Sequence, residues 1–431
     1  MFIVYVKLAA SVILALLLVL VMSRRSWLEE RLGASDRPWL LYFWLVLRFL
    51  PYLGVYIILG YMPQSDVTYY YYPISLTALD GGIPYRDVYS GYSPLFGYWL
   101  APFLAIWRDP RMVVFAMLLV EGLATHLTYR FYRAQDAQGE RIFRVLFYYL
   151  LPLPFVMCVF SGQEDVLVWL WALLAIPFMQ PNQHGQTRPF IAGLVLGLGM
   201  LSTKVVFVLL LMPVFLLKID DLRFSARFVA GLLIVIIPVL AFLYWKTGLL
   251  FLEQQASEGD VLKAPNWRSI LNPILTDKVR SASAIWKWLS LVITLLVMLR
   301  GVWLVRTWHT DWRYRDYLPF IVVLVYSVMT VVQQNAISNY AYVFMLPLMF
   351  TLVDFRRSAQ CVWLVVFNIL AAIHPSLWWR LGQPFYERIA ALLKPVALLE
   401  YTIEVAIIVG FVYYAIQAMN ALRRSKTVTQ A

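Results

Sequence analysis

The sequence predicts an all-α, polytopic integral membrane protein, a single multi-pass membrane domain over residues 1–431. Hydrophobic residues make up 62% of the 431, charged residues make up 14%, and the mean hydropathy is +0.71. Soluble domains carry much more charge than this, so nearly the whole chain belongs in a bilayer. The net charge of +12 comes from short basic clusters between apolar runs. This is the positive-inside pattern, and it argues against a contiguous nucleic-acid-binding face.

Apolar runs of near-spanning length follow one another along the chain. The first, residues 2–22, is longer than the apolar core of a signal peptide and no small-residue cleavage site follows it, so we interpret it as a retained anchor. The later single runs lie at 39–61, 112–132, 143–160, 166–180, 228–245, 284–305, 317–332, 339–353, 359–374 and 396–418.

The run at 190–217 is long enough for one tilted span or for two short ones. Lys204 lies at its middle, within Ser202-Thr203-Lys204. A lysine at mid-membrane is costly unless it meets water or a partner, so we expect a turn there that carries Lys204 into an outward-open cavity. The alternative is one helix with a snorkelling Lys204. Two short spans bring the total to about thirteen, with the N-terminus outside and the C-terminus inside.

The basic clusters assign the intervening loops to sides of the membrane. If the loops rich in arginine and lysine are cytoplasmic, the loop Gln64–Trp99 and a second large loop, 246–283, both lie outside. The segment Pro94–Trp107 is apolar but too short to span, and we expect an interfacial helix there. Residues 62–107 are thus predicted to form a structured extracytoplasmic catalytic loop.

The first outer loop is polar, acidic and rich in tyrosine inside an otherwise apolar chain. Loops of this length between elements are usually functional or disordered, and its aromatic residues favour order. Its carboxylates, Asp66, Asp80 and Asp87, are therefore candidates for chemistry. By contrast, Cys158 and Cys361 lie in apolar runs and the four histidines have no ligand spacing, so the sequence predicts neither a disulfide nor a metal framework.

Three segments of the first half carry a resemblance to a known class. The first comprises Ser65-Asp66, an aromatic run, residues 81–87 (GGIPYRD) and Tyr92-Ser93-Pro94-Leu95. The others are residues 161–165 (SGQED) and 193–204 (GLVLGLGMLSTK). Together they resemble the polyprenyl-phosphate-sugar-dependent glycosyltransferases of the GT-C class, in particular the bacterial mannosyltransferase-like members. One departure is visible, because such enzymes usually have Glu-Tyr-Pro-Pro where this chain has residues 91–94, Gly-Tyr-Ser-Pro.

The resemblance implies a GT-C-like bundle and a glycosyltransferase reaction. A monosaccharide, with mannose as one candidate, would pass from a polyprenyl-phosphate donor to an extracytoplasmic glycan, lipid or protein. No nucleic acid is expected as a partner. A bacterial inner (cytoplasmic) membrane is the expected location, because the chain has no Asn-x-Ser/Thr sequon. The resemblance assigns no certain cofactor, although a divalent metal ion is compatible with it. The competing function is a transporter or flippase of a lipid-linked sugar.

The resemblance places the general base at Asp66, which must take a proton from the attacking hydroxyl. The alternative role for Asp66 is a helix N-cap. Asp87 is a candidate second carboxylate, or else it pairs with Arg86 or caps a turn. Glu164 and Asp165 are also candidates, for a substrate or metal role. Adjacent helical residues point about 100° apart, so we expect only one of the two to face the cavity and the other to cap the helix.

The remaining candidates bind phosphate or sugar. A leaving lipid phosphate needs cations, and these are Lys204, Arg268, Lys263 and Arg86 in order of preference. The alternative for Lys263 and Arg268 is a solvated loop. The candidates for contacts to sugar or acceptor are Tyr85, Tyr92, Gln163, Gln333, Gln334 and Tyr340. Intramembrane Arg48 either snorkels or pairs with a carboxylate of a neighbouring helix.

Overall fold

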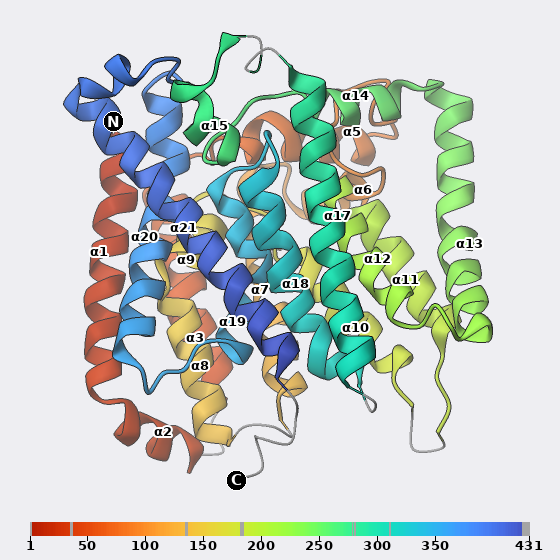
Figure 1. Ribbon diagram of the computed structural model, residues 1–431, viewed down its shortest axis with the longest axis horizontal. Coiled ribbons are helices and arrows are strands. Elements are labelled where there is room, and N and C mark those ends of the chain that lie inside the picture. Colours follow the sequence, from red (N-terminus) through yellow and green to blue (C-terminus); the bar gives the residue numbers. More distant parts are fainter. Residues whose placement is uncertain are drawn as a thin grey trace.

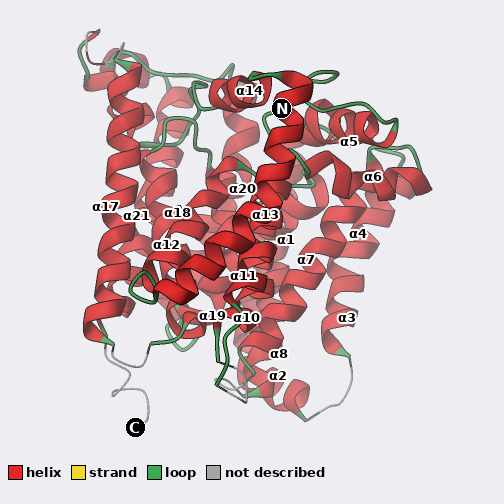
Figure 2. Ribbon diagram, turned by 90° about the vertical axis from the view of Figure 1, so that its right-hand side faces the viewer, coloured by secondary structure: helices red, strands yellow, loops and turns green. Residues whose placement is uncertain are grey.

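The computed structural model describes residues 2–34, 38–133, 137–181, 185–277, 279, 282–309 and 312–424. Over these residues the regular elements are helices, and the β structure is limited to an isolated bridge between Pro84 and Val88 (Figure 2). The predicted all-α membrane fold is therefore confirmed.

Eight helices in the described residues are long and apolar enough to cross a membrane. Seven of them are α1 (Phe2–Ser23), α7 (Arg111–Phe131), α13 (Leu222–Thr247), α17 (Ser283–Trp308), α18 (Tyr314–Val332), α20 (Ser358–Arg380) and α21 (Pro395–Arg423). The eighth, Trp39–Ile58, contains two π-helical stretches and consists of α3 (Trp39–Trp44), η1 (Leu45–Phe49), α4 (Leu50–Tyr52) and η2 (Leu53–Ile58).

A ninth candidate span is bent. Helix α8 (Gln138–Leu150) is followed by α9 (Pro152–Phe155) and η4 (Val156–Phe160), and the two halves meet at 60°. Pro152 explains the bend, because a proline disfavours helical backbone in the residue before it. Four further apolar helices have 10–17 residues: α6 (Phe96–Ile106), α10 (Leu167–Met179), α11 (Pro189–Ser202) and the pair η5 (Val205–Phe207) and α12 (Val208–Leu217). The predicted count of about thirteen spans is thus not confirmed, because several apolar runs form short or broken helices.

The remaining helices are short connectors and caps. They are α2 (Arg25–Gly33), η3 (Val67–Tyr71), α5 (Tyr72–Leu79), α14 (Leu250–Glu258), α15 (Trp267–Leu271), η6 (Asn272–Ile274), η7 (Ser338–Tyr340), α19 (Ala341–Thr351) and η8 (Ile389–Leu393). One end of the bundle holds α5, α14 and α15 together with α6, and α2 lies at the other end (Figure 1). The predicted loops 62–107 and 246–283 thus share one end, with residues 278, 280 and 281 outside the described residues.

Burial differs strongly between the helices. The most apolar window of α18 is 72% buried inside the molecule, whereas that of α13 is only 17% buried. Helix α18 is therefore central, and α13 stands at the edge of the bundle, where its leucines and isoleucines are exposed (Figure 1). Such apolar exposure is expected of a surface that faces lipid.

Glycines allow the peripheral helix α13 to pack closely against α11. A Cβ atom on Gly193 would lie 2.1 Å from the carbonyl oxygen of Phe228, and one on Gly231 would lie 2.1 Å from that of Phe190. Only glycine permits this approach of two backbones, as in other membrane helix pairs. The glycine-rich segment 193–204 thus has a packing role in addition to the resemblance it carries.

Candidate functional site

Asp66 begins the π-helical turn η3, directly after Ser65, which has a positive φ of 59°. Its side chain makes no capping hydrogen bond to that helix. Instead, its Oδ2 accepts a hydrogen bond of 3.0 Å from Nε2 of Gln163, and the residue remains partly exposed. The alternative role as a side-chain N-cap is therefore not what the geometry shows.

Gln163 connects the first loop, through Asp66 and Tyr71, to Asn339 of η7. It follows Gly162, whose positive φ of 54° and close approach to Val67 require a residue without a side chain. Besides donating to Asp66, Gln163 presents Oε1 to the hydroxyl of Tyr71 at 3.4 Å and to Nδ2 of Asn339 at 3.3 Å. Because Gln163 is buried and bonded on both sides, the Asp66 carboxylate is held in one orientation.

Lys204 lies in the break between two helices. Helix α11 ends at Ser202 and η5 starts at Val205, so the expected turn is present and the alternative of a continuous helix does not hold. The first loop holds this break, because Ser93 donates its backbone N–H to the Thr203 carbonyl at 3.1 Å. The ammonium group of Lys204 faces the rings of Tyr92 and Tyr340, at 5.3 and 5.5 Å from their centroids.

Both Glu164 and Asp165 contact Lys204. Glu164 forms an ion pair with the ammonium group, and Oδ1 of Asp165 lies 3.4 Å from it. The expectation that only one of the two faces the cavity is wrong, because they precede α10, which starts at Leu167, and helical spacing does not apply to them. Neither caps that helix through its side chain.

The buried groups perturb one another's titration. Burial raises the pKa of Asp165 to about 7, although Lys204 opposes the shift. Burial works against the charge of Lys204, but Asp165 and Glu164 hold the pKa of its ammonium group well above the usual value. Three carboxylates, Asp66, Glu164 and Asp165, thus lie near two lysines, Lys204 and Lys7, so the group carries surplus negative charge once Asp165 ionises.

Two residues of this cluster, Tyr71 and Lys7, were missed by the sequence argument, whereas Tyr92 was predicted. The hydroxyl of Tyr71 donates to Glu164, and the hydroxyl of Tyr92 lies 3.4 Å from that of Tyr71. The aromatic run 69–72 gave no sign of which tyrosine points inward. Lys7 of α1 lies close by, 3.4 Å from Oγ of Ser161, and the Asp66 carboxylate is near enough to act on its charge. A lone lysine in an apolar run was the available signal for it.

Arg86 and Asp87 lie apart from these contacts, whereas the Tyr85 hydroxyl donates to the backbone carbonyl of Tyr92. Arg86 and Asp87 are both exposed and form an ion pair of 2.8 Å. The Arg86 guanidinium and the Ile83 backbone N–H, which donates to Asp87 at 2.7 Å, lower the pKa of Asp87 to about 2. Asp87 thus has the geometry of the alternative, a residue that closes a turn. Tyr85 is buried and receives a hydrogen bond of 2.9 Å from Nε2 of Gln255 of α14.

Arg268 and Lys263 meet Gln334 instead of Lys204. The Arg268 guanidinium donates to Oε1 of Gln334, and the backbone N–H of Lys263 donates to the Gln334 carbonyl at 2.9 Å. Arg268 is buried, which excludes a purely solvated loop at this position. Gln333 is partly buried next to Gln334. Of the three residues predicted in this segment, Gln333, Gln334 and Tyr340, Tyr340 is the one that contacts Lys204.

Arg48 has a partner inside the bundle. Its Nε lies 2.6 Å and its Nη2 lies 3.0 Å from the two carboxylate oxygens of Glu121, and both side chains are fully buried. Of the two alternatives for Arg48, pairing with a neighbouring helix is therefore the observed one.

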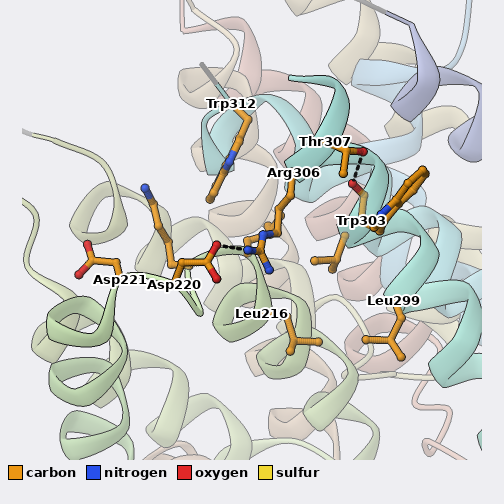
Figure 3. Close-up of a pocket in the computed structure, with 11 residues that line it drawn as sticks. Leu216, Asp220, Asp221, Leu299, Trp303, Arg306, Thr307 and Trp312 are labelled. Carbon is orange, nitrogen blue, oxygen red and sulfur yellow. Dashed lines mark hydrogen bonds and ion pairs between the residues drawn. The ribbon is translucent and has the colours of Figure 1, made fainter. Parts of the chain in front are cut away.

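Two cavities lie in different parts of the bundle. The larger, of about 830 Å³, lies between the ends of α12 and α17 and is lined by Leu216, Leu299, Trp303 and Trp312, with an ion pair of Arg306 and Asp220 at its rim (Figure 3). It contains none of the predicted site residues. The smaller, of about 370 Å³, is an apolar groove between Pro94–Leu95 and the Pro238–Leu243 segment of α13.

Comparisons with known proteins find similarity among solved structures alone. No protein-family model matches the sequence. No curated protein matches it significantly. Among solved structures, the chain is similar to ArnT from Cupriavidus metallidurans bound to undecaprenyl phosphate, at 12% identity and a TM-score of 0.48. The alignment covers 90% of this chain and 79% of the other. A likeness at this level leaves the function to be argued from the residues of the site.

Proposed function

We propose that this protein is an integral membrane glycosyltransferase that transfers a monosaccharide from a polyprenyl-phosphate donor to a hydroxyl of an extracytoplasmic glycan, lipid or protein. The observation that carries the proposal is the placement of Asp66. It is a partly exposed carboxylate, oriented by a buried glutamine, at the edge of the buried group that contains Lys204.

Asp66 fits the role of general base. In the transfer, the acceptor oxygen bonds to the anomeric carbon while the bond from that carbon to the phosphate oxygen breaks. The phosphate leaves with the electron pair, Asp66 takes the proton of the attacking hydroxyl, and attack opposite the phosphate inverts the anomeric centre. The Gln163 amide donates to one oxygen of Asp66, and the Ser65 hydroxyl lies 3.4 Å from the other. Each carboxylate oxygen has two lone pairs, so the partly exposed group can still accept the proton of the attacking hydroxyl.

Lys204 fits the role of phosphate ligand. Its side chain is 18% exposed, while those of Glu164 and Asp165 are 1% and 2% exposed, so Lys204 is more accessible to a ligand than either of its carboxylate partners. A phosphate that binds there adds negative charge to a group already rich in carboxylates. Protonation of Asp165 or a divalent cation at Glu164 and Asp165 would offset that charge.

An apolar groove adjoins Lys204. The smaller cavity is lined by Pro94, Leu95, Tyr98 and four residues of α13, and its lining is almost entirely apolar. The backbone N–H of Leu95 donates to the Leu201 carbonyl at 2.7 Å, next to the break that carries Lys204. A polyprenyl tail in the groove would therefore place its phosphate near the ammonium group.

Transfer assays with purified full-length protein in lipid nanodiscs test this proposal. A panel of polyprenyl-phosphate monosaccharides, mannose included, would identify the donor from the wild-type protein. Asp66→Asn keeps the size of the side chain but cannot accept a proton, so turnover should fall about 10²- to 10⁴-fold while donor binding persists. Asp80→Asn is the matched control, because Asp80 pairs with exposed Arg108 and lies outside the site.

The same variants separate the enzyme from a transporter or flippase of a lipid-linked sugar. A carrier needs no proton acceptor, so Asp66→Asn would leave translocation into proteoliposomes intact. Sugar translocation without transfer in the wild type, unaffected by Asp66→Asn, would overturn the enzyme assignment.

The predicted side of the active site has its own test. Tyr69 of the first loop is 74% exposed and Trp27 of α2 is 55% exposed. Helix α5, which follows Tyr69 in the chain, lies at the opposite end of the bundle from α2 (Figure 1). The native cysteines are buried and should not react with a thiol reagent. In intact cells an impermeant thiol reagent should label Tyr69→Cys and spare Trp27→Cys. The reverse pattern would place the first loop in the cytoplasm.

A further inference from the structure

A second buried cluster of charged side chains lies between α20 and α21. It consists of His374, Glu400 and Glu404, whose side chains are 0–2% exposed. Nε2 of His374 lies 3.2 Å from Oε1 of Glu400 and 3.8 Å from Oε1 of Glu404. The two glutamates are four residues apart on α21, which puts them on one face of that helix. None of the three takes part in the contacts around Asp66.

We propose that His374, Glu400 and Glu404 bind a divalent transition-metal ion of the zinc type. One imidazole nitrogen and two carboxylate oxygens are common ligands of such ions. Three donor atoms, one from each residue, lie within 4.8 Å of one another. Donors bound at about 2.1 Å around a tetrahedral ion are about 3.4 Å apart, so small side-chain rotations bring this set to a common centre.

Unsatisfied polar atoms point to a missing ligand. Oε2 of Glu400 and Nδ1 of His374 are buried and have no hydrogen-bond partner among the described residues. The hydroxyl of Tyr386 is close enough to act on the charge of Glu400, but it makes no well-directed hydrogen bond to that oxygen. A buried carboxylate oxygen without a partner is costly, and a metal ion would remove that cost.

Charge balance supports the same assignment. A protonated His374 would neutralise only one of the two glutamates, so without a metal ion the other would have to hold a proton to avoid a buried negative charge. A neutral histidine, two carboxylates and a divalent ion sum to zero, which is the balanced arrangement in a low-dielectric interior.

An outer hydrogen bond orients one ligand. Oγ of Ser269 donates to Oε2 of Glu404 at 2.7 Å. Ser269 is itself fixed by a reciprocal capping box with Asn266 at the start of α15. Hydrogen bonds of this kind to metal ligands commonly set their orientation and affinity. The ion would thus tie α15, and with it Arg268, to α20 and α21.

Metal analysis of the full-length protein tests the proposal without any transfer assay. The ligands are buried and exchange should be slow, so the protein is prepared from cells grown with added zinc, freed of any histidine tag, and dialysed against chelator. Wild-type protein should retain one zinc ion per chain, and both His374→Gln and Glu404→Gln should lose it. His126→Gln, at an exposed histidine of α7, is the matched control and should keep the ion.

A gentler variant keeps the test decisive if the ligand variants do not fold. Ser269→Ala leaves all three ligands in place and should weaken zinc binding about 10- to 100-fold in a chelator competition. Asp66→Asn should keep full zinc content, so failure of the metal site and failure of the proposed enzyme are distinguishable. Wild-type protein without zinc, or unchanged zinc content and affinity in the His374, Glu404 and Ser269 variants, would overturn the proposal.

Discussion

The Arg48–Glu121 pair and the group around Lys204 are both buried, but their charges are matched differently. Arg48 meets one carboxylate with two nitrogens, and its Nη1 donates to the backbone carbonyl of Tyr149 at 2.8 Å. Lys204 meets two carboxylates, with a third, Asp66, nearby through Gln163. The first arrangement is closed and neutral, and nothing further can bind to it. The second keeps an exposed edge and surplus charge, which suits a site that must accept a ligand.

The largest contrast should come from the same substitution in both groups. Glu121→Gln leaves Arg48 buried without a counter-charge, and breaking a buried pair from one side typically costs about 3–5 kcal/mol. Glu164→Gln leaves Lys204 paired with Asp165, so we expect a loss of about 1 kcal/mol or less in stability. Unfolding of each variant in mixed detergent micelles measures both. Equal losses would mean that the two groups are alike and that the Lys204 group is merely structural.

A double variant checks the reason for that cost. Arg48→Met combined with Glu121→Leu removes both charges from the bundle interior. Because a buried pair is often replaceable by apolar side chains without net loss, the double variant should be markedly more stable than either single change. A double variant as unstable as the sum of the single ones would assign the cost to packing instead of charge.

The segments that form the site could be predicted from the sequence more completely than the contacts between their side chains. The helix break at Lys204 followed from the cost of isolated charge in a membrane, whereas for Arg48 the same argument left snorkelling and pairing with a carboxylate both open. The joint contact of Glu164 and Asp165 with Lys204 did not, because it depends on where α10 begins, and helix ends are poorly fixed by apolar patterns. Nor did the histidine cluster, since His374 and the glutamates lie 26 and 30 residues apart in the chain. The Glu-x-x-x-Glu spacing within the last apolar run was the one available signal.

Two tyrosines at the edge of the site offer a sharper contrast. Tyr71 donates to the buried carboxylate Glu164, whereas Tyr92 has only a 3.4 Å contact with another hydroxyl. Tyr71→Phe leaves a buried charged oxygen without its donor and should lower the free energy of unfolding by about 1.5–3 kcal/mol. Tyr92→Phe keeps the ring beside Lys204 and should cost less than about 1 kcal/mol.

The activities of these two variants should reverse that order if Tyr92 contacts sugar or acceptor. Loss of the Tyr92 hydroxyl would then raise KM without destabilising the protein. A Tyr92→Phe enzyme that matches wild type in both stability and KM would remove Tyr92 from the binding residues.

The last contrast is a pH dependence that only the Lys204 group can show. Burial raises the pKa of Asp165 from 3.8 to about 7, so the folded protein holds a proton there that the unfolded chain loses. Stability contributed by this group therefore falls as the pH rises from about 4 to about 7, the opposite of an ordinary paired carboxylate.

Ionised Asp165 also adds negative charge beside the proposed phosphate site, while a phosphodiester donor keeps a constant charge. The KM for donor should rise about tenfold between pH 6 and pH 8, an electrostatic change of about 1.4 kcal/mol. Asp165→Asn should make KM independent of pH, and steady-state kinetics at matched acceptor concentration would measure both. If the wild type and Asp165→Asn showed the same pH profile, the proton would lie elsewhere and Asp165 would not govern donor binding.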